Sequence, residues 1–406
     1  MKPYLLLIPL LLAFGGCQKE PLPNNGPDKE FTPIVLTKAE EGINTGVNEF
    51  GLKLYRSLYN KDQEFISPLS VSLALSMTAY GARGTTEQEM IATLGFGEAT
   101  RDQVGGYYKK MVPALLEADN KTTLEIANSI WVKDMIKLMP DFSNGVTDYF
   151  NTDIFSKNFS SGSLIAEINK WCSDKTHGLI KEAAKDLDPS TVMALVNALY
   201  FKGMWSTEFN DAVDGKFTTL TSASVSAKMM SKTGSYKYAQ QGGYRMVSVP
   251  YGNGAFVMDI ILPEEEGADA FHNAVKGLTW DVYSNLIGSE YSTEVCITMP
   301  TFKMEYDTDL CEILAAMGMP AAFDPSVADF SGMTSSGDLF ISQVIHKTYV
   351  DVHEKGTEAA AVTIVGMKFT STGPGNTIYF TADRPFIFAI RETSTNSLLF
   401  IGNKVN

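Results

Sequence analysis

The sequence predicts a single domain of the α+β class, with a large mixed, mostly antiparallel sheet, further sheets and several helices. Three observations support this. Apolar residues recur at helical spacing in the first third of the chain, strand-type alternation dominates the later half, and no repeat or break in composition follows residue 40 of the 406. The apolar content of 44% allows a sizeable core, so the chain is not disordered as a whole.

The first two helices are predicted from apolar spacing and from a capping residue. Val47, Phe50 and Leu58 belong to a stripe with spacings of three and four residues, which is one face of an amphipathic helix. Ser67 is a good cap and Pro68 a good first residue for a second helix, whose apolar residues up to position 80 cover nearly every side. We therefore expect this second helix to be buried at the centre of the domain.

Two shorter helices are predicted from their end signals. Thr86 and Glu89 have the spacing of a capping box, and Gly95 would end that helix. Asp307 is the expected cap of a helix in the later half, which Gly318 would end.

Strands are predicted where the apolar period changes from helical to alternating. Residues 339–352 show this most clearly, with one face made of Val344, His346, Thr348, Val350 and Val352. The other β-rich segments are residues 256–262, 295–299, 378–380, 386–390 and 398–401.

The first 38 residues are expected to lie outside the domain, which then comprises residues 39–406. Residues 5–14 form an apolar run too short to cross a bilayer, and two glycines precede Cys17. This pattern resembles a lipoprotein signal peptide of residues 1–16 with acylation at Cys17; an ordinary secretory signal is the alternative. Residues 17–38 are polar and rich in proline, which predicts a disordered tether. We expect an exported protein, lipid-anchored to an outer membrane on its periplasmic or its surface face.

Charge and missing motifs disfavour several function classes. The net charge of −14 argues against a nucleic-acid partner. No G-x-S-x-G elbow and no phosphate-binding P-loop motif occur, and Thr357 stands where H-E-x-x-H requires its second histidine. Cys172, Cys296 and Cys311 lack metal or disulfide spacing and are expected to be buried apolar residues. We expect no enzymatic activity, no metal and no cofactor.

Residues 350–372 carry a functional signal. Glu354, Lys355 and Gly356 follow the alternating strand and precede a long stretch of small, β-capable residues that continues to Gly373. The simplest interpretation is a strand, a turn and a second strand or helix. Such a stretch left outside a sheet is a liability for aggregation, so its presence indicates that it is meant to join a sheet.

At these residues the sequence resembles inhibitory members of the serpin family. The segment EKGTEAAA is similar to the serpin hinge, which here comprises Glu354, Gly356, Thr357, Glu358, Ala359, Ala360 and Ala361. The resemblance covers nearly the whole chain after residue 40 and includes residues 65–70, 195–205, 344–347, 384–386 and 400–402. The lipoprotein start and residues 367–370 resemble bacterial lipoprotein serpins of the miropin type.

The resemblance implies a covalent suicide inhibitor of serine proteases, with cysteine proteases as a second target class. A protease attacks an exposed reactive loop, here about residues 354–380, and is trapped as an acyl-enzyme when the cleaved loop inserts into the central sheet. Serpin loop insertion is an established example of β-strand addition. The implied partners are trypsin-, elastase- or chymotrypsin-like proteases and, through the anchor, a membrane. We expect a monomer.

Strand alternation predicts how the hinge can enter a sheet. One face carries no charge and comprises Thr357, Ala359, Ala361, Thr363, Val365 and Met367, whereas Glu358 and Lys368 lie on the opposite face. Slipping by one residue would bury both charges, so insertion has one sensible register. Residues 357–370 would extend about 46 Å at about 3.3 Å per residue, which would carry an attached protease across most of the inhibitor.

The scissile bond is assigned by the family's spacing. Counting from Glu354 places it between Thr370 and Ser371, whereas counting back from Pro385 places it near Pro374. The hinge count is preferred because the inserted length is mechanically constrained. The alternative cleavage positions are Val365, Lys368 and Phe369, so we expect broad specificity.

The resemblance also assigns two clusters around the opening sheet. Ser67, Ser70, Asn197 and His346 correspond to the shutter beneath the parting strands, with ordinary buried polar groups as the alternative. Trp205 corresponds to the breach, where the loop first enters. There Glu354 would pair with Lys303 or a neighbouring cation, although the family often has Lys where this chain has Thr301.

A non-inhibitory serpin acting as a surface binding protein is the second candidate. Such members tend to carry charged, bulky or proline residues in the hinge. The inserting face of residues 356–361 has none of these, so inhibition is the preferred prediction.

Overall fold

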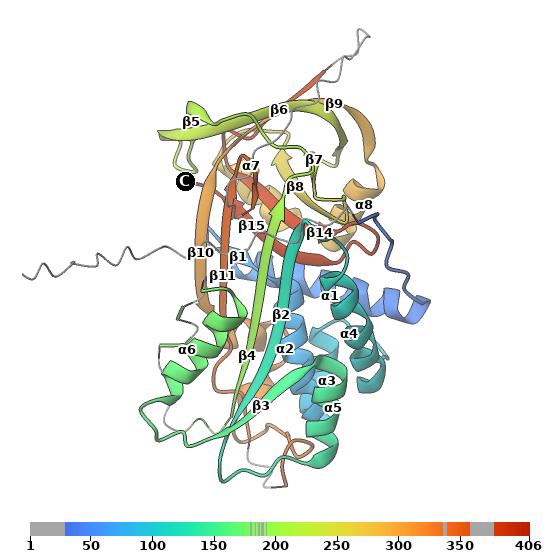
Figure 1. Ribbon diagram of the computed structural model, residues 1–406, viewed down its shortest axis with the longest axis vertical. Helices are drawn as coiled ribbons and strands as arrows, with labels where there is room; N and C mark the ends of the chain where they lie inside the picture. Colours follow the sequence, from blue (N-terminus) through green and yellow to red (C-terminus); the bar gives the residue numbers. More distant parts are fainter. Residues whose placement is uncertain are drawn as a thin grey trace, which may run out of the picture.

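The computed structural model describes residues 29–178, 181–182, 184–185, 187, 191, 193–335, 339–357 and 377–406. Two sheets and the helices packed on them form the molecule, which confirms the predicted α+β class (Figure 1). The helices are α1 (Lys38–Leu58), α2 (Pro68–Gly81), α3 (Gly84–Thr93), α4 (Arg101–Leu116), α5 (Pro140–Phe150), α6 (Leu164–Lys175), α7 (Ala268–Gly277), α8 (Trp280–Gly288) and α9 (Cys311–Met317), with a 3-10 turn at Pro320–Phe323.

Among the described residues, the first sheet has six strands, and it runs along the long axis of the molecule (Figure 1). Its order is β10 (Phe302–Asp309), β11 (Ile345–His353), β12 (Gly356–Thr357), β4 (Met193–Met204), β2 (Thr122–Lys133) and β3 (Thr152–Lys157). Neighbouring strands are antiparallel except β2 and β3, which are parallel. We call it the long sheet.

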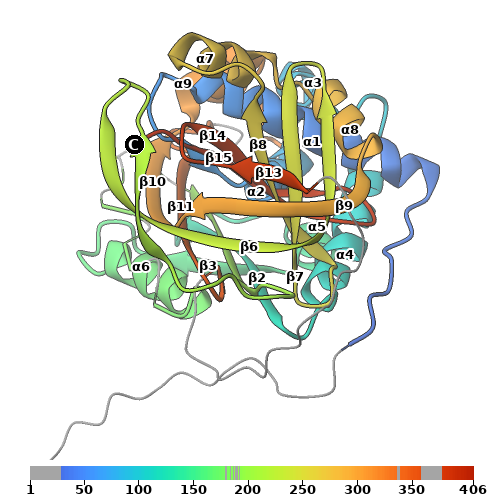
Figure 2. The same ribbon diagram turned by 90° about the horizontal axis from the view of Figure 1, so that it is seen from above.

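The second sheet, with nine strands in the part of the chain that the structure describes, lies across one end of the first, as the view from above shows (Figure 2). Its order is β1 (Phe65–Ile66), β15 (Leu398–Lys404), β14 (Phe386–Glu392), β8 (Phe256–Pro263), β7 (Tyr244–Tyr251), β6 (Ser224–Gln241), β9 (Tyr291–Pro300) and β13 (Ile378–Thr381), with β5 (Val213–Thr218) paired to β6. Strands were thus predicted correctly near residues 256, 295, 378, 386 and 398. The long strand β6 was not predicted, and residues 339–344 lie outside β11.

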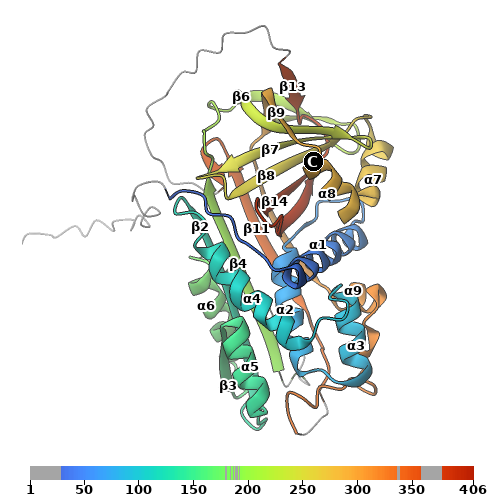
Figure 3. The same ribbon diagram turned by 90° about the vertical axis from the view of Figure 1, so that its right-hand side faces the viewer.

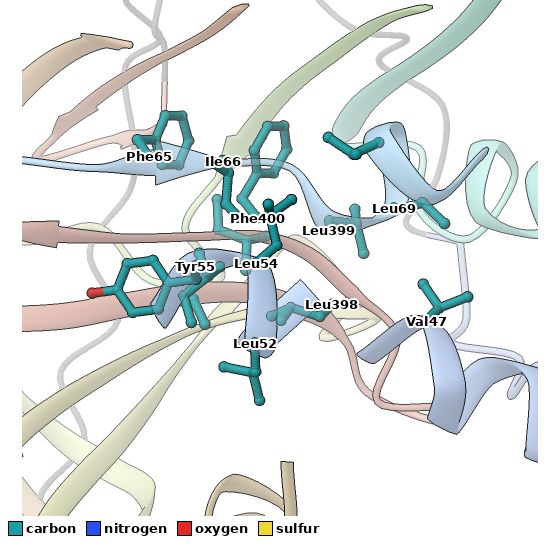
Figure 4. Close-up of a cluster of buried hydrophobic side chains, with 14 of the residues drawn as sticks. Val47, Leu52, Leu54, Tyr55, Phe65, Ile66, Leu69, Leu398, Leu399 and Phe400 are labelled. Atoms are coloured by element: carbon teal, nitrogen blue, oxygen red, sulfur yellow. The ribbon is translucent and has the colours of Figure 1, made fainter. Parts of the chain in front are cut away.

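Helices α1, α2 and α4 lie together on one side of the long sheet (Figure 3). Ser67 caps α2 as predicted: its side chain accepts a hydrogen bond from Ser70 N, and Pro68 is the first helical residue. Around this helix, side chains from α1, β1 and β15 pack into one core cluster, including Leu54, Phe65, Leu69 and Phe400 (Figure 4). The predicted central, buried helix is therefore confirmed.

Two predicted caps are wrong. Helix α3 begins at Gly84, so Thr86 lies inside it, where its hydroxyl accepts a hydrogen bond from Asp329 N. Glu89 accepts a hydrogen bond from Ala321 N, so both members of the expected capping box bind other segments. Asp307 belongs to β10, and the carboxylate of Asp309 accepts from Cys311 N at the start of α9.

The predicted tether also needs correction at its end. Residues 29–37 lie against the domain: Lys29 N donates to Asn120 Oδ1, Ile34 N donates to Ser394 Oγ, and Ile34 and Leu36 pack on the core. Thr37 then forms a complete capping box with Glu40 at the start of α1. Of the predicted tether, only residues 17–28 lie outside the described part of the chain.

Three cysteines lie in the described part of the chain, and all are free thiols. Cys172 is buried, which raises the pKa of its thiol to about 12, whereas Cys296 and Cys311 are half-buried. Within the described residues, no helix is long and apolar enough to cross a bilayer.

Candidate functional site

The long sheet contains a seam between β4 and β11. Among the described residues, these two strands do not pair with each other, and the two-residue strand β12 pairs with both at one end. There Gly356 pairs with Met204 and His353, and Thr357 pairs with Gly203 and Val352. We call the rest of the boundary between these two strands the seam: residues 193–202 of β4 on one side and residues 345–351 of β11 on the other.

Two small cavities lie along the seam. One, of about 50 Å³, is lined by Leu195 and Asn197 of β4, Ile345 and Lys347 of β11, and Cys172 of α6. The other, of about 40 Å³, lies on the α2 side of the same strands. The seam therefore has a cavity on each face of the sheet, one on the α6 side and one on the α2 side.

The start of the predicted hinge is already within this sheet. Thr357 is buried, and its hydroxyl shares a hydrogen bond of 2.7 Å with the hydroxyl of Tyr251. A Cβ atom on Gly356 would lie 2.1 Å from the carbonyl oxygen of Gly203, so a glycine is needed for the close approach to β4. Thr357 is one of the residues predicted to point into the core, and its side chain is buried.

A turn at residues 205–209 holds the residues that precede β12. Three successive carbonyls accept hydrogen bonds from this turn: His353 O from the Trp205 indole at 2.9 Å, Glu354 O from Phe209 N at 2.8 Å, and Lys355 O from Trp205 N at 3.0 Å. The Trp205 ring stacks on Tyr251 with centroids 4.3 Å apart. Trp205, which the resemblance assigns to the breach, therefore lies against residues 353–355 at the start of the predicted hinge.

The predicted ion pair between Glu354 and Lys303 is not formed. Lys303 instead lies 2.9 Å from the Asp351 carboxylate, its cross-strand neighbour on β11, and this hydrogen bond and charge raise the pKa of Lys303. The carboxylate of Glu354 accepts a hydrogen bond from Ala212 N at 3.0 Å. A backbone donor close to the hinge thus replaces the expected lysine.

The four predicted shutter residues come together where α2 begins beneath the seam. Ser67 N donates to His346 Nε2 at 3.0 Å, and Ser67 Oγ donates to Leu399 O. Ser70 Oγ donates to Asn197 Oδ1. Asn128 of β2, which sequence reasoning missed, accepts from Asn197 Nδ2 at 2.6 Å, so the network reaches both strands of the seam and β2.

His346 is neutral in this network. Burial lowers the pKa of its imidazole to about 4, because a charged ring would lose its hydration. Its Nε2 accepts the Ser67 hydrogen bond, which assigns the proton to Nδ1. Protonation at Nε2 would remove that acceptor.

Several predicted site residues lie outside the described residues. These are Glu358, Ala359, Ala360 and Ala361 of the hinge, the reactive-bond candidates Val365, Lys368, Phe369, Thr370 and Ser371, and the lipidation candidate Cys17. Beyond the loop, β13 begins at Ile378 and pairs in parallel with β9.

Comparison with known proteins identifies relatives along nearly the whole chain. Residues 45–406 match the family model described as Serpin (serine protease inhibitor). Intracellular coagulation inhibitor 2 of Tachypleus tridentatus is 35% identical over 413 residues, covering 98% of this chain and 97% of the relative. Leukocyte elastase inhibitor A of Rattus norvegicus is 32% identical, covering 89% and 98%.

Solved structures with the same architecture include a thermophilic serpin and a thyroxine-binding protein. The native state of the thermophilic serpin tengpin superposes with a TM-score of 0.84 at 32% identity, covering 93% of this chain and 97% of that one. Human thyroxine-binding globulin superposes with a TM-score of 0.81 at 28% identity, covering 91% and 99%.

Proposed function

The chain belongs to the serpin family of serine protease inhibitors and is not an enzyme; from this premise we propose that it traps serine proteases covalently by inserting its cleaved reactive loop into the seam of the long sheet. The seam carries this proposal, because β12 brings the start of the hinge between β4 and β11. A strand that continues in the same register would pair with both neighbours along their length.

The register of β12 supports insertion of a strand of the predicted length. Extending the β4 pairing places residue 363 opposite Asn197, and extending the β11 pairing places the same residue opposite His346. Thr363 has the same parity as Thr357 and so would face the core beside these two polar residues. Polar neighbours at Asn197 and His346 would account for a threonine at position 363, on a face that is otherwise mostly apolar. The β4 register reaches Met193 at residue 367, close to the predicted scissile bond.

The expected test result is an adduct that resists denaturants. After incubation with trypsin, chymotrypsin or elastase, a denaturing gel should show a band at the summed mass of the protease and of the chain without its C-terminal peptide, because the ester bond survives denaturation. Mass analysis should identify a released C-terminal peptide that begins at or near Ser371. A set of proteases that all cleave the loop and depart fully active would contradict the proposal. Catalytically dead protease serves as the control and should form no adduct.

The structural likeness to thyroxine-binding globulin makes a binding protein the second candidate. The two functions differ in the fate of the loop after cleavage. If the cleaved loop joins the long sheet, new ladder hydrogen bonds of about 1 kcal/mol net each should raise the unfolding temperature by tens of degrees. Calorimetry of intact and nicked protein measures this shift, and an unchanged unfolding temperature would favour the binding protein.

We extend the proposal to the location of the protein, an exported lipoprotein anchored to an outer membrane through Cys17, similar to bacterial lipoprotein serpins. Labelled palmitate should be incorporated into the full chain, and Cys17→Ala should abolish the label and release the protein from membranes, since a diacylated cysteine anchors stably. Cys172→Ala is the matched control and should keep the label. Unlabelled, soluble wild-type protein would refute the anchor and leave inhibition untouched.

A further inference from the structure

Lys232 on β6 is a buried lysine in an unusual environment. Its side chain is 5% exposed, and no carboxylate among the described residues forms an ion pair with it. Its Nζ donates a hydrogen bond of 2.7 Å to the carbonyl of Thr207, the middle of the 205–209 turn. A lysine is rarely buried without an acidic partner, because desolvation of the charge is costly.

Aromatic rings surround this amine. Its Nζ lies 4.2 Å from the ring centroid of Phe209, 5.5 Å from that of Trp205 and 5.2 Å from that of Tyr236. The Trp205 and Phe209 rings also contact each other edge to face. We call these three rings and the Thr207 carbonyl the lysine box. The rings attract a cation less strongly than water does, so they offset only part of the desolvation.

Two residues of the lysine box, Trp205 and Phe209, also donate hydrogen bonds to the residues before β12. Trp205 donates to the carbonyls of His353 and Lys355, and Phe209 N donates to that of Glu354. The 205–209 turn therefore contacts Lys232 on one side and the residues immediately before β12 on the other. A displacement of the turn away from both Lys232 and residues 353–355 would break these three hydrogen bonds.

We propose that Lys232 acts as a proton-operated release of the hinge: opening of the 205–209 turn exposes its amine to water, the amine takes up a proton there, and proton uptake thus favours the opened turn. The closed turn is most stable when the amine is neutral. Lowering the pH towards neutrality loosens the attachment of residues 353–355. The hydrogen bond and the ring contacts of Lys232 are with Thr207, Trp205, Phe209 and Tyr236 and not with the loop, so Lys232 is a positioning residue.

The direction of the pH dependence follows from the different pKa of Lys232 in the closed and in the opened turn. Burial lowers the pKa of Lys232 to about 7, whereas the ordinary pKa of an exposed lysine is 10.5. Between these values the opened turn binds one proton more than the closed turn, so the opening constant should fall about tenfold per pH unit as the pH rises. Below about pH 7 both forms are protonated and the dependence ends.

Two tyrosines and a histidine near the lysine box also have shifted pKa values. On the same strand, burial raises the pKa of Tyr236 to about 12, and burial also raises the pKa of Tyr251 behind Trp205. Burial lowers the pKa of His353 in the hinge, so that imidazole changes charge below pH 6.5. The other charged residues of segments 205–211 and 353–355 are Glu208, Asp211, Glu354 and Lys355.

Hydrogen exchange of the full chain tests the release without any protease. The amides of Trp205 and Phe209 bond to the hinge, so their protection, after correction for the intrinsic exchange rate, reports opening of the turn. In the wild type we expect protection to rise about tenfold per pH unit between about pH 7.5 and 9. A wild-type profile that is flat in this range would overturn the proposal, whatever the variants do.

Three variants complete the test. Lys232→Met keeps the length and apolar stem of the side chain and should give high protection that does not change with pH. Lys232→Arg keeps the charge at every pH and should give low, flat protection. Lys237→Met removes an exposed charge from the same strand and should follow the wild type. If Lys232→Met shows the wild-type slope, another group takes up the proton and the proposal is wrong. Because no inhibition is measured, these outcomes are distinguishable from failure of the proposed function.

Discussion

Replacing Thr357 by arginine is expected to turn the inhibitor into a substrate that proteases cleave without being trapped. Thr357 is 2% exposed between β4 and β11, and its hydroxyl meets that of Tyr251. A guanidinium at this position must lose its hydration or push the hinge out of the sheet, at several kcal/mol. In the proposed mechanism, insertion of the loop competes with hydrolysis of the acyl-enzyme, so about 1.4 kcal/mol on the insertion barrier already shifts the partition about tenfold.

The measurement is the number of moles of inhibitor consumed per mole of protease silenced. We expect at least a tenfold increase for Thr357→Arg, with cleavage of the loop unchanged. Thr357→Val keeps the shape but removes the hydrogen bond to Tyr251, so it should raise the ratio only a few-fold. Glu358→Arg changes charge on the face predicted to point outward and should have little effect. Equal effects of arginine at 357 and 358 would refute the assigned faces.

Protonation of His346 is expected to destabilise the protein as the pH falls. Its pKa of about 4 lies below the ordinary histidine pKa of 6.5, so the unfolded chain binds a proton that the folded chain does not. The contribution of His346 is therefore fully present above pH 6.5 and is lost as the pH falls towards 4. The shift corresponds to a loss of about 3 kcal/mol in the free energy of unfolding.

Glu64 has the opposite dependence and must be separated from His346. Burial raises the pKa of the Glu64 carboxyl to about 7, so its contribution to stability increases as the pH falls from 7 to 4.5. We therefore compare the wild type with His346→Gln, which keeps an acceptor for Ser67 N and does not titrate. Urea unfolding should show the wild type losing about 3 kcal/mol relative to the variant between about pH 7.5 and pH 4. A difference independent of pH would contradict the neutral, buried imidazole.

Several features of the site were predictable because they depend on neighbours along the chain. The cap of α2 follows from Ser67 and Pro68, which act within one helical turn. The alternation that buries His346, Thr348, Val350 and Val352 is confirmed on β11, and the same parity buries Thr357. The shutter and breach residues followed from resemblance, and the structure brings the shutter residues together and places Trp205 against the hinge.

Other features required the tertiary structure, because they depend on which distant segments meet. Asp351 lies opposite Lys303 through the register of β10 and β11, and this cross-strand contact replaces the expected pair with Glu354. Thr86 and Glu89 have the spacing of a capping box, yet the Thr86 hydroxyl accepts a hydrogen bond from the backbone N–H of Asp329, which lies far along the chain.

The fold class, the family and the burial of Thr357 were predictable from the sequence, since periodicity and short motifs encode these features locally. The position of β12 between β4 and β11, and the contact of the Lys232 amine with the 205–209 turn, could be seen only in the folded chain. Strand register and packing set the hydrogen-bond partners of a side chain and its solvation. A spacing of residues along the chain does not contain that information.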